Sequence, residues 1–287
     1  MKIASIDAGH GPSLALRDDD GSVIDLRHLG NEVPSGLRQL LELGPQTLAH
    51  VEKRSRSISD RLDPATVTFR PLLSDSHALW CAALNYRTHI TEGNWEQPSW
   101  PPFFLRVGAS LVGHLEPMVV PTVSDRLDYE GELAIVIGRR GRHVPEADAY
   151  DIISGYSCFN DGSVRDWQRH TTQITSGKNF SRTGPFGPWL TTRDEVPDIE
   201  SAQLSTVLNG KVMQEAKIGE MIFGIPKLVN YLSTMVELLP GDVIVTGTPG
   251  GVGTRQDPQV FLAEGDVIEV AVEGVGRLTN PIVREEI

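Results

Sequence analysis

The sequence predicts a β-rich α+β fold with short inserted helices. Its 287 residues include 28 Gly and 19 Pro, which separate short apolar or alternating runs of the kind that form strands. Only residues 219–239 keep helical periodicity over several turns. Strands and helices do not alternate regularly, so a sandwich, roll or barrel is expected rather than a doubly wound parallel sheet.

The first 72 residues are expected to form a small α+β module. Its expected strands are residues 2–7, 13–17 and 22–27. Two segments with helical spacing follow, and Ser35 and Pro45 are the expected helix starts. A unit of this size is small for a domain, so it should pack against residues 73–287.

Residues 73–287 are expected to form the larger domain. Its expected strands are residues 77–84, 117–121, 130–138, 152–159, 204–214, 242–247 and 266–273. The helix at 219–239 places four apolar side chains on one stripe, namely Leu228, Leu232, Met235 and Leu239. Such a stripe is typical of a helix that packs against the core.

Composition excludes several classes of function. A formal net charge of −12 disfavours nucleic acid as a partner, because phosphate binding needs clustered Lys and Arg. No stretch has the 18 or so apolar residues of a membrane span. Two cysteines, Cys81 and Cys158, cannot make a disulfide framework, and the N-terminus lacks the pattern of a signal peptide. A cytoplasmic location is therefore expected.

Two glutamates begin the most apolar predicted strand, in the stretch DYEGELAIVIG. Glu130 and Glu132 are two positions apart, so in a strand they face the same side. At about 4 Å, two carboxylates repel by several kcal/mol in a protein-like dielectric. Such a pair raises a pKa or requires a cation between the two groups. An exposed strand edge is the simpler interpretation of the pair taken alone.

A third carboxylate follows the next apolar strand, in FNDGSVRDWQ. If that strand lies beside the first, Asp161 completes an all-oxygen triad with Glu130 and Glu132. Hard divalent cations such as Mg²⁺ and Mn²⁺ prefer such ligands. The alternative for Asp161 is a helix N-cap, a position that aspartate favours.

Seven segments together resemble the fumarylacetoacetate hydrolase family. From about Leu84 to the C-terminus they follow the family's order: LNYRTHITEGN, FFLRVGASLVG, DYEGELAIVIG, FNDGSVRDWQ, SGKNFSRTGPFGPWL, LLPGDVIVTGTPGGVG and EGDVIEVAVEGVGRLTNPI. The chain looks like a bacterial acylpyruvase or fumarylpyruvate hydrolase. The resemblance implies a mixed β-sandwich roll and a homodimer.

The resemblance also implies the inner part of an active site. It assigns Mg²⁺ or Mn²⁺ to Glu130, Glu132 and Asp161, which leaves those three groups and the ion about one unit negative. An anionic substrate would then need further positive charge, which Lys178 of SGKNF is expected to supply. Gln168, which follows the Asn-Asp motif, is expected to orient water or substrate.

A His-x-x-Glu pair lies in the first of the seven segments. By resemblance, His89 and Glu92 form a dyad on a flexible lid, in which the glutamate orients the histidine and the histidine takes a proton from water. Trp95 and Trp100 follow in a Gly- and Pro-containing loop. They are expected either to close an apolar cover over the substrate or only to pack the loop down.

Three further residues are expected to contact the substrate: Tyr86 of the lid segment, Thr248 of the glycine-rich loop, and Arg106. Arg106 stands where many family members have lysine, and its planar fork suits a carboxylate. The small residues Gly162 and Ser163 next to Asp161 are expected to enlarge the pocket.

The implied activity is that of a hydrolase acting on a carbon–carbon bond in a ketonic substrate. The expected substrate is a 2,4-diketo acid of the acylpyruvate or fumarylpyruvate type, or a related β-diketone, as in the breakdown of aromatic compounds. His89 would activate water while the metal stabilises the enolate. The alternatives are decarboxylation of a β-keto acid such as oxaloacetate, isomerisation or hydration of an unsaturated 2-oxo acid, ring opening of a bulkier diketone, and a non-catalytic binding protein.

Overall fold

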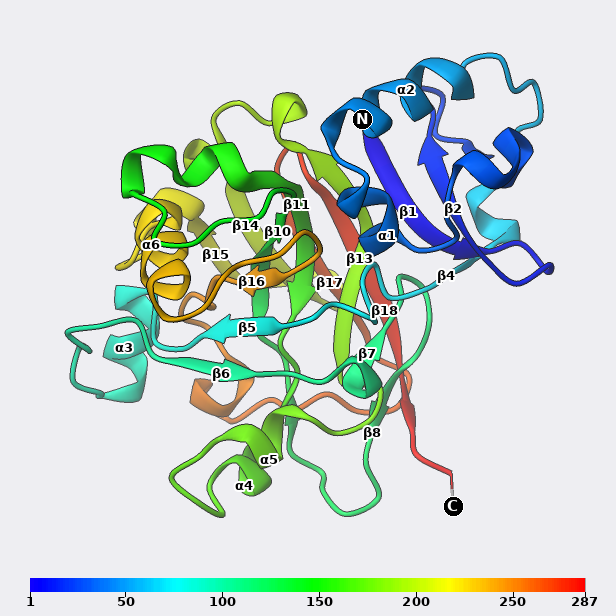
Figure 1. Cartoon of the computed structure of the whole chain (residues 1–287). Coiled ribbons are helices and arrows are strands. Elements are labelled where there is room, and N and C mark those ends of the chain that lie inside the picture. The colour runs from blue at the N-terminus through cyan, green and yellow to red at the C-terminus, as the bar shows by residue number, and fades with distance from the viewer. Residues whose placement is uncertain (287) are drawn as a thin grey trace.

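A strongly curved mixed sheet organises most of the protein, which we describe from a computed structural model covering residues 1–286. The sheet has eleven strands: β1 (Lys2–Asp7), β2 (Pro12–Arg17), β3 (Val23–Asp25), β4 (Thr68–Phe69), β5 (Leu79–Ala82), β6 (Phe103–Leu105), β7 (Leu111–Val112), β10 (Gly131–Ile137), β11 (Ile153–Asn160), β13 (Gly184–Thr192) and β16 (Val243–Val245). In Figure 1, β5, β6 and β16 run across the direction of β11 and β13, although all are joined in one path of hydrogen bonds.

A second sheet packs on this one and makes a sandwich. It has five strands, in the order β15 (Lys211–Lys217), β14 (Gln203–Leu208), β17 (Val267–Val272), β18 (Gly276–Arg284) and β8 (Met118–Val120). A separate pair joins β12 (Ser163–Val164) to β9 (Leu127–Asp128). The main core lies between the sheets, where Leu133 and Ile135 of β10 meet Leu204 of β14 and Val270 of β17. The expected β-rich fold is confirmed.

The helices are short and lie outside the sheets. They are α1 (Leu37–Glu42), α2 (Pro45–Ser55), α3 (Arg87–Gly93), α4 (Arg165–Gln168), α5 (Thr175–Lys178) and α6 (Ile225–Met235). Within residues 1–286, no helix is both long and apolar enough to cross a membrane.

The N-terminal strands extend the large sheet. β1 pairs with β13 as well as with β2 and β4, so the first residues share hydrogen bonds with the remainder of the chain. Leu40 and Leu41 of α1 belong to the same apolar cluster as Ala134 and Val136 of β10. In Figure 1 this region is the blue lobe beside the sandwich. The proposed division into residues 1–72 and 73–287 stays a prediction.

Two sequence-based expectations about elements are wrong. The predicted strand 204–214 is two strands, β14 and β15, because Asn209 and Gly210 both take positive φ (50° and 80°) and turn the chain back. The predicted helix 219–239 is limited to α6. Pro226 fixes its start, and Val236 is extended and ends it. Leu228 and Leu232 are buried as expected.

The other two members of the predicted apolar stripe do not face the core. Met235 is 49% exposed, and Leu239 lies beyond the end of the helix. β13 and β18 were not among the expected strands, because their Gly and Pro residues resemble turn signals.

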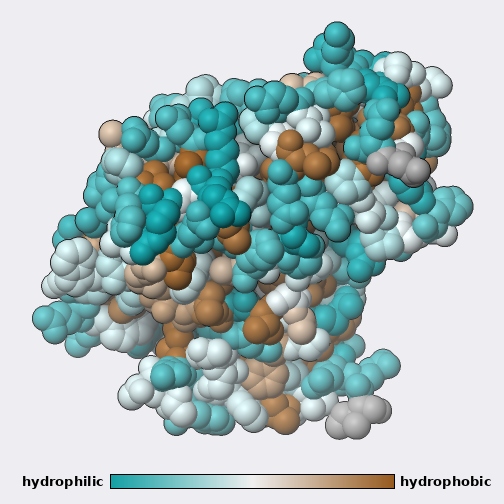
Figure 2. Space-filling model, in the orientation of Figure 1, coloured by the Kyte–Doolittle hydropathy of each residue, from teal (hydrophilic) through white to brown (hydrophobic). Residues whose placement is uncertain are grey.

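The face drawn in Figure 2 is mostly hydrophilic, with hydrophobic residues gathered toward its centre and lower part. Several large apolar side chains are exposed around β6, among them Trp100, Leu105 and Val107. The homodimer expected from the resemblance stays a prediction.

Candidate active site

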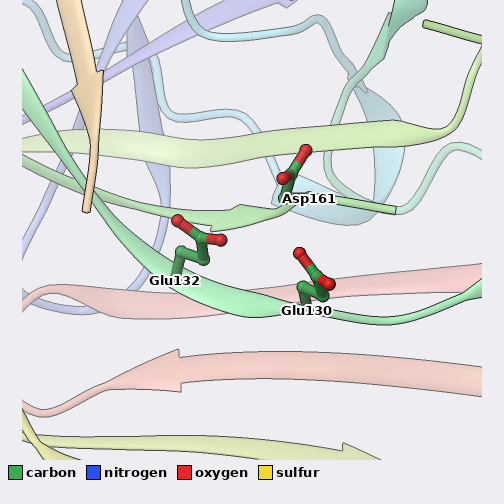
Figure 3. Close-up of side chains that lie close together, drawn as sticks. All are labelled: Glu130, Glu132 and Asp161. Atoms are coloured by element: carbon green, nitrogen blue, oxygen red, sulfur yellow. The ribbon is translucent and has the colours of Figure 1, made fainter. Parts of the chain in front are cut away.

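The register between β10 and β11 brings the three carboxylates of the sequence-based triad together. Gly131 pairs with Asn160 in this antiparallel ladder, so Glu130 and Asp161, one step further along each strand, lie opposite each other. Figure 3 shows Glu130 and Glu132 on one strand and Asp161 on its neighbour. One oxygen from each carboxylate lies within 4.8 Å of the others, and all three residues are buried.

Backbone hydrogen bonds fix these carboxylates. Asp161 donates its N–H to the carbonyl of Glu130 at 2.8 Å, and the Glu130 N–H donates to Asn160 Oδ1 at 2.9 Å. The Gly247 N–H donates to Glu132 Oε2. Gly247 has φ +97°, and a Cβ there would lie 2.7 Å from Asn85 Cβ, so the close approach to Glu132 depends on glycine.

Two buried cations bind the same carboxylates. Lys178 Nζ lies 2.6 Å from Glu130 Oε2 and 2.6 Å from Asp161 Oδ2. Arg165 Nη1 lies 2.7 Å from Glu130 Oε1 in an ion pair, and its Nε donates to Asp128 Oδ2 at 2.7 Å. Burial would lower the pKa of Lys178, but Asp161 and Glu130 raise it above its ordinary value. These two carboxylates therefore favour the charged form of Lys178.

Arg106 is a third buried cation and corrects a sequence-based expectation. Its Nη1 donates to Asp161 Oδ1 at 2.6 Å and to the Gly162 carbonyl at 3.0 Å. Its Nη2 and Nε donate to Thr183 and Ser110. Arg106 does not line the cavity, so its planar fork supports a carboxylate of the protein instead of meeting a substrate.

The charges around the triad are nearly balanced. We call the following seven residues the floor: Asp128, Glu130, Glu132, Asp161, Arg106, Arg165 and Lys178. Four carboxylates and three cations leave one net negative charge, so a divalent cation would make the floor positive by one unit. The expectation of a negatively charged metal-loaded site considered only the three carboxylates of the triad. Asp128 and the three cations of the floor change that net charge, so the expectation is corrected.

Glu132 is the floor carboxylate that no cation contacts among residues 1–286. Burial and the negative charges of Asp161 and Glu130 raise the pKa of Glu132 well above its ordinary value. A cation bound by the triad would relieve this repulsion. Three buried carboxylate oxygens also form the donor set that Mg²⁺ and Mn²⁺ prefer, so the residues present fit such an ion.

The lid dyad faces the same cavity. His89 and Glu92 lie on α3, where Nδ1 of the imidazole is 2.7 Å from Glu92 Oε1. The other glutamate oxygen accepts the Gly251 N–H at 2.7 Å, and Thr88 Oγ1 accepts the Gly250 N–H at 3.0 Å. His89 lines the cavity. The hydrogen bond to Glu92 leaves Nε2 as the imidazole nitrogen available to a ligand.

The cavity above the floor has a volume of about 540 Å³. Gln168 lines it and accepts a hydrogen bond from Arg165 at 3.1 Å. Thr248 also lines it, but the Thr248 hydroxyl already donates to the Gly131 carbonyl and accepts from Gln214. Tyr86 does not line it. The Tyr86 ring packs in the main core and its hydroxyl has no partner among the described residues, so the expected substrate contact is not supported.

Small residues near Asp161 serve packing. A Cβ on Gly162 would lie 2.1 Å from the Thr183 carbonyl oxygen, and neither Gly162 nor Ser163 lines the cavity. The expectation that they enlarge the pocket is therefore wrong. Gly177 has a comparable role, since a Cβ there would lie 2.5 Å from Gln168. Because Gly177 has no side chain, α5 can pack on α4, and this packing places Lys178 at the floor.

Sequence reasoning missed two floor residues that stand inside the quoted motifs. Asp128 begins DYEGELAIVIG, and Arg165 lies four residues after Asp161. Asp128 also accepts the N–H groups of Gly253 and Thr254 at 2.8 and 2.9 Å. A charged residue at the edge of a very apolar strand was the available signal, because buried charges need partners.

Comparison with known proteins identifies the relatives of this chain. A family model described as fumarylacetoacetate (FAA) hydrolase C-terminal matches residues 78–283. A mitochondrial oxaloacetate tautomerase of Bos taurus, FAHD2A, is 35% identical over 288 aligned positions, which cover 99% of this chain and 92% of the relative.

Two solved structures share the fold over the whole chain. A 5-carboxymethyl-2-hydroxymuconate delta-isomerase from Mycobacterium smegmatis is 30% identical with a TM-score of 0.76. A maleylpyruvate hydrolase from Sphingobium sp. SYK-6, in complex with manganese(II) and pyruvate, is 26% identical with a TM-score of 0.84. Each covers 100% of both chains. Since the family model spans most of the chain and the tautomerase is similar over nearly all of it, the protein belongs to the fumarylacetoacetate hydrolase family.

Proposed function

We propose that this protein is a metal-dependent enzyme that moves a proton at the carbon beside the 2-oxo group of a small oxo acid. One observation carries the proposal. The imidazole of His89, oriented by Glu92, faces the same cavity as the buried triad of Glu130, Glu132 and Asp161. A base and a cation-binding cluster in one cavity are what enolisation of such an acid requires.

The triad would hold Mg²⁺ or Mn²⁺. When bound, the ion polarises the 2-oxo group and stabilises negative charge on its oxygen. The manganese and pyruvate in the related hydrolase structure support both the ion and the class of ligand.

The residues of the chain supply proton transfer and charge. His89 accepts a proton through Nε2, and Glu92 stabilises the resulting imidazolium through Nδ1. Lys178, which is paired with Glu130 and Asp161, offsets negative charge at the floor. Gln168, whose carbonyl oxygen is held by Arg165, is left with its amide N–H groups to orient a substrate or a water molecule.

Tautomerisation of oxaloacetate is the reaction that we favour. It needs one group that removes a proton from carbon and returns it to oxygen, and the dyad provides such a group. The tautomerase relative, similar over 99% of this chain, supports this choice.

Hydrolytic cleavage of a 2,4-diketo acid is the second candidate. In that reaction the dyad would activate water, as expected from the sequence. The cavity of about 540 Å³ favours it, because a four-carbon acid leaves much of such a volume unfilled. Decarboxylation and the isomerisation or hydration of unsaturated 2-oxo acids share the same enol chemistry.

A product panel separates these reactions. The protein loaded with Mn²⁺ or Mg²⁺ is mixed with oxaloacetate, acetylpyruvate and fumarylpyruvate. Enol absorbance is followed over time, and products are identified by NMR. We expect rapid keto–enol exchange of oxaloacetate without release of carbon dioxide. Conversion of none of the three acids, or activity that survives exhaustive chelation, would overturn the proposal.

A further inference from the structure

Two exposed arginines line the cavity. Arg169 and Arg255 are both exposed, whereas the floor is buried. With Trp95, which also lines the cavity and is 40% exposed, they form what we call the mouth. Apart from the mouth and the floor, the lining is largely apolar and includes Leu84, Phe104, Ile174 and Val252.

The mouth arginines are the cavity's uncommitted positive charges. Lys178 and Arg165 are each bound to two carboxylates of the floor. In contrast, no carboxylate of residues 1–286 forms an ion pair with Arg169 or Arg255, and neither guanidinium donates a hydrogen bond within that part of the chain. An anion that enters the cavity therefore finds free donors at its mouth.

The residue before each arginine is hydrogen-bonded to the floor. Arg169 follows Gln168, which accepts from Arg165 at 3.1 Å. Arg255 follows Thr254, whose N–H donates to Asp128 Oδ2 at 2.9 Å. Asp128 and Arg165 in turn bind each other. The same buried ion pair thus positions the backbone of both mouth arginines.

Trp95 gives Arg255 a further support. The guanidinium carbon lies 4.9 Å from the centre of the indole, within the range of a cation–π interaction. The indole also meets the edge of His89, with ring centres 5.1 Å apart. A Cβ on Gly93 would lie 2.0 Å from the indole, so this placement of Trp95 depends on glycine. Arg255 is therefore oriented by the lid that carries the proposed base.

The charge balance indicates what these arginines bind. A divalent cation would leave the floor positive by one unit, which one carboxylate of the substrate offsets. A second carboxylate finds no cation there that lacks a protein carboxylate as partner, and only Nη2 of Arg165 is left without a hydrogen bond among the described floor cations. We propose that Arg169 and Arg255 bind a second carboxylate, at the end of the substrate away from the 2-oxo acid group, so that the enzyme selects dianionic oxo acids. This inference rests on the proposed function for the site of the first carboxylate.

A matched pair of ligands tests the inference without turnover. 2-Oxoglutarate and 2-oxopentanoate have the same number of carbons, but only the first has a second carboxylate. Their dissociation constants are measured by calorimetry on the Mn²⁺-loaded protein. We expect 2-oxoglutarate to bind about 10-fold more tightly, because charged hydrogen bonds are strong but an exposed site is hydrated.

Variants then test whether the mouth arginines cause the preference for 2-oxoglutarate. In the double variant Arg169→Gln, Arg255→Gln we expect the ratio of the two dissociation constants to fall to near one, with that of 2-oxopentanoate unchanged. The double variant Arg56→Gln, Arg140→Gln is the control for net charge. Arg56 and Arg140 are 78% and 68% exposed and lie outside the cavity, so this variant should keep the full ratio. Because the mouth is exposed, added salt should reduce the wild-type ratio.

The possible failures can be told apart. Equal binding of the two acids by the wild-type protein, or a double variant that keeps the preference, would overturn the inference alone. Failure of the wild-type protein to bind either acid would overturn the proposed 2-oxo acid site, and the inference with it.

Discussion

The floor and the mouth of the cavity differ in how their charged side chains are stabilised. At the floor, every charged residue except Glu132 is paired at 2.6–2.7 Å, and the carboxylates stand at the ends of strands while Arg165 and Lys178 come from α4 and α5. At the mouth, Arg169 and Arg255 are exposed, lie at the ends of short helical segments and have no carboxylate partner within residues 1–286. Burial forces partners on the floor, whereas hydration lets the mouth keep free charges.

This difference suggests separate roles, with cation binding at the floor and substrate selection at the mouth. A buried cluster in which all charges but that of Glu132 are paired holds its geometry and leaves one carboxylate that favours a bound cation. An exposed pair of arginines offers binding energy that depends on salt and can be changed without exposing a buried charge. Changes at the floor should therefore abolish chemistry, while changes at the mouth should alter which substrate is accepted.

Glu132→Gln should have the largest effect. It removes one proposed ligand while leaving every cation of the floor with its carboxylate partner, because Glu132 has no ion pair among the described residues. We expect loss of Mn²⁺ binding by calorimetry and a fall in turnover of roughly 10³-fold or more, since a metal contributes several kcal/mol to such reactions.

The thermal stability of the metal-free protein provides an independent check on the role of Glu132. The raised pKa of Glu132 reflects burial and repulsion, which glutamine relieves, so the melting temperature of metal-free Glu132→Gln should equal or exceed that of the metal-free wild type. Asp125→Asn is the control, since Asp125 lies on the surface with an 86% exposed side chain and should keep full activity. Full Mn²⁺ affinity in Glu132→Gln would remove Glu132 from the proposed ligand set.

His89→Asn should have the next largest effect. Without the base, proton transfer should slow by about 10²- to 10⁴-fold. The dissociation constant of 2-oxopentanoate should change little, because the proposed binding of its 2-oxo acid group depends on the floor. His50→Asn, which alters a 61% exposed histidine on α2, should match the wild type. Undiminished turnover in His89→Asn would assign proton transfer to another group.

Gly93→Ala should have the smallest effect and should act on the mouth. The added Cβ would lie 2.0 Å from the Trp95 ring, which must move and leave Arg255 without its support. We expect a several-fold higher KM for oxaloacetate, little change in metal affinity and an altered tryptophan fluorescence spectrum. Gly36→Ala is the control, because no atom lies closer than 3.5 Å to a Cβ at that position. An unchanged KM together with a shifted spectrum would separate Trp95 from substrate binding.

Much of the floor could be predicted from the sequence, because strand periodicity and motif order are local properties. The spacing of Glu130 and Glu132 placed both on one face, the end of the next apolar strand suggested Asp161, and the resemblance added Lys178. The structure brings all four together. Whether they act as proposed stays a prediction.

The remaining features depend on contacts between distant segments. Arg106 has a planar guanidinium that could bind a substrate carboxylate. In the structure it instead bonds to Asp161 and Thr183 and does not line the cavity. Arg169 and Arg255 carry no local signal, since an exposed arginine on a loop is ordinary. Their shared cavity follows from the tertiary fold, which single-sequence patterns do not encode.

The pairing of Gly131 with Asn160 limits how this protein can change over evolutionary time. Side chains alternate along a strand, so an insertion or deletion of one residue within β10 or β11 would turn one carboxylate of the triad to the opposite face. Substitutions of exposed residues such as Trp95, Arg169 and Arg255 leave this register unchanged, whereas length changes in these two strands do not. Descendants of this chain can acquire new substrates by remodelling the segments around the entrance while inheriting the catalytic centre intact.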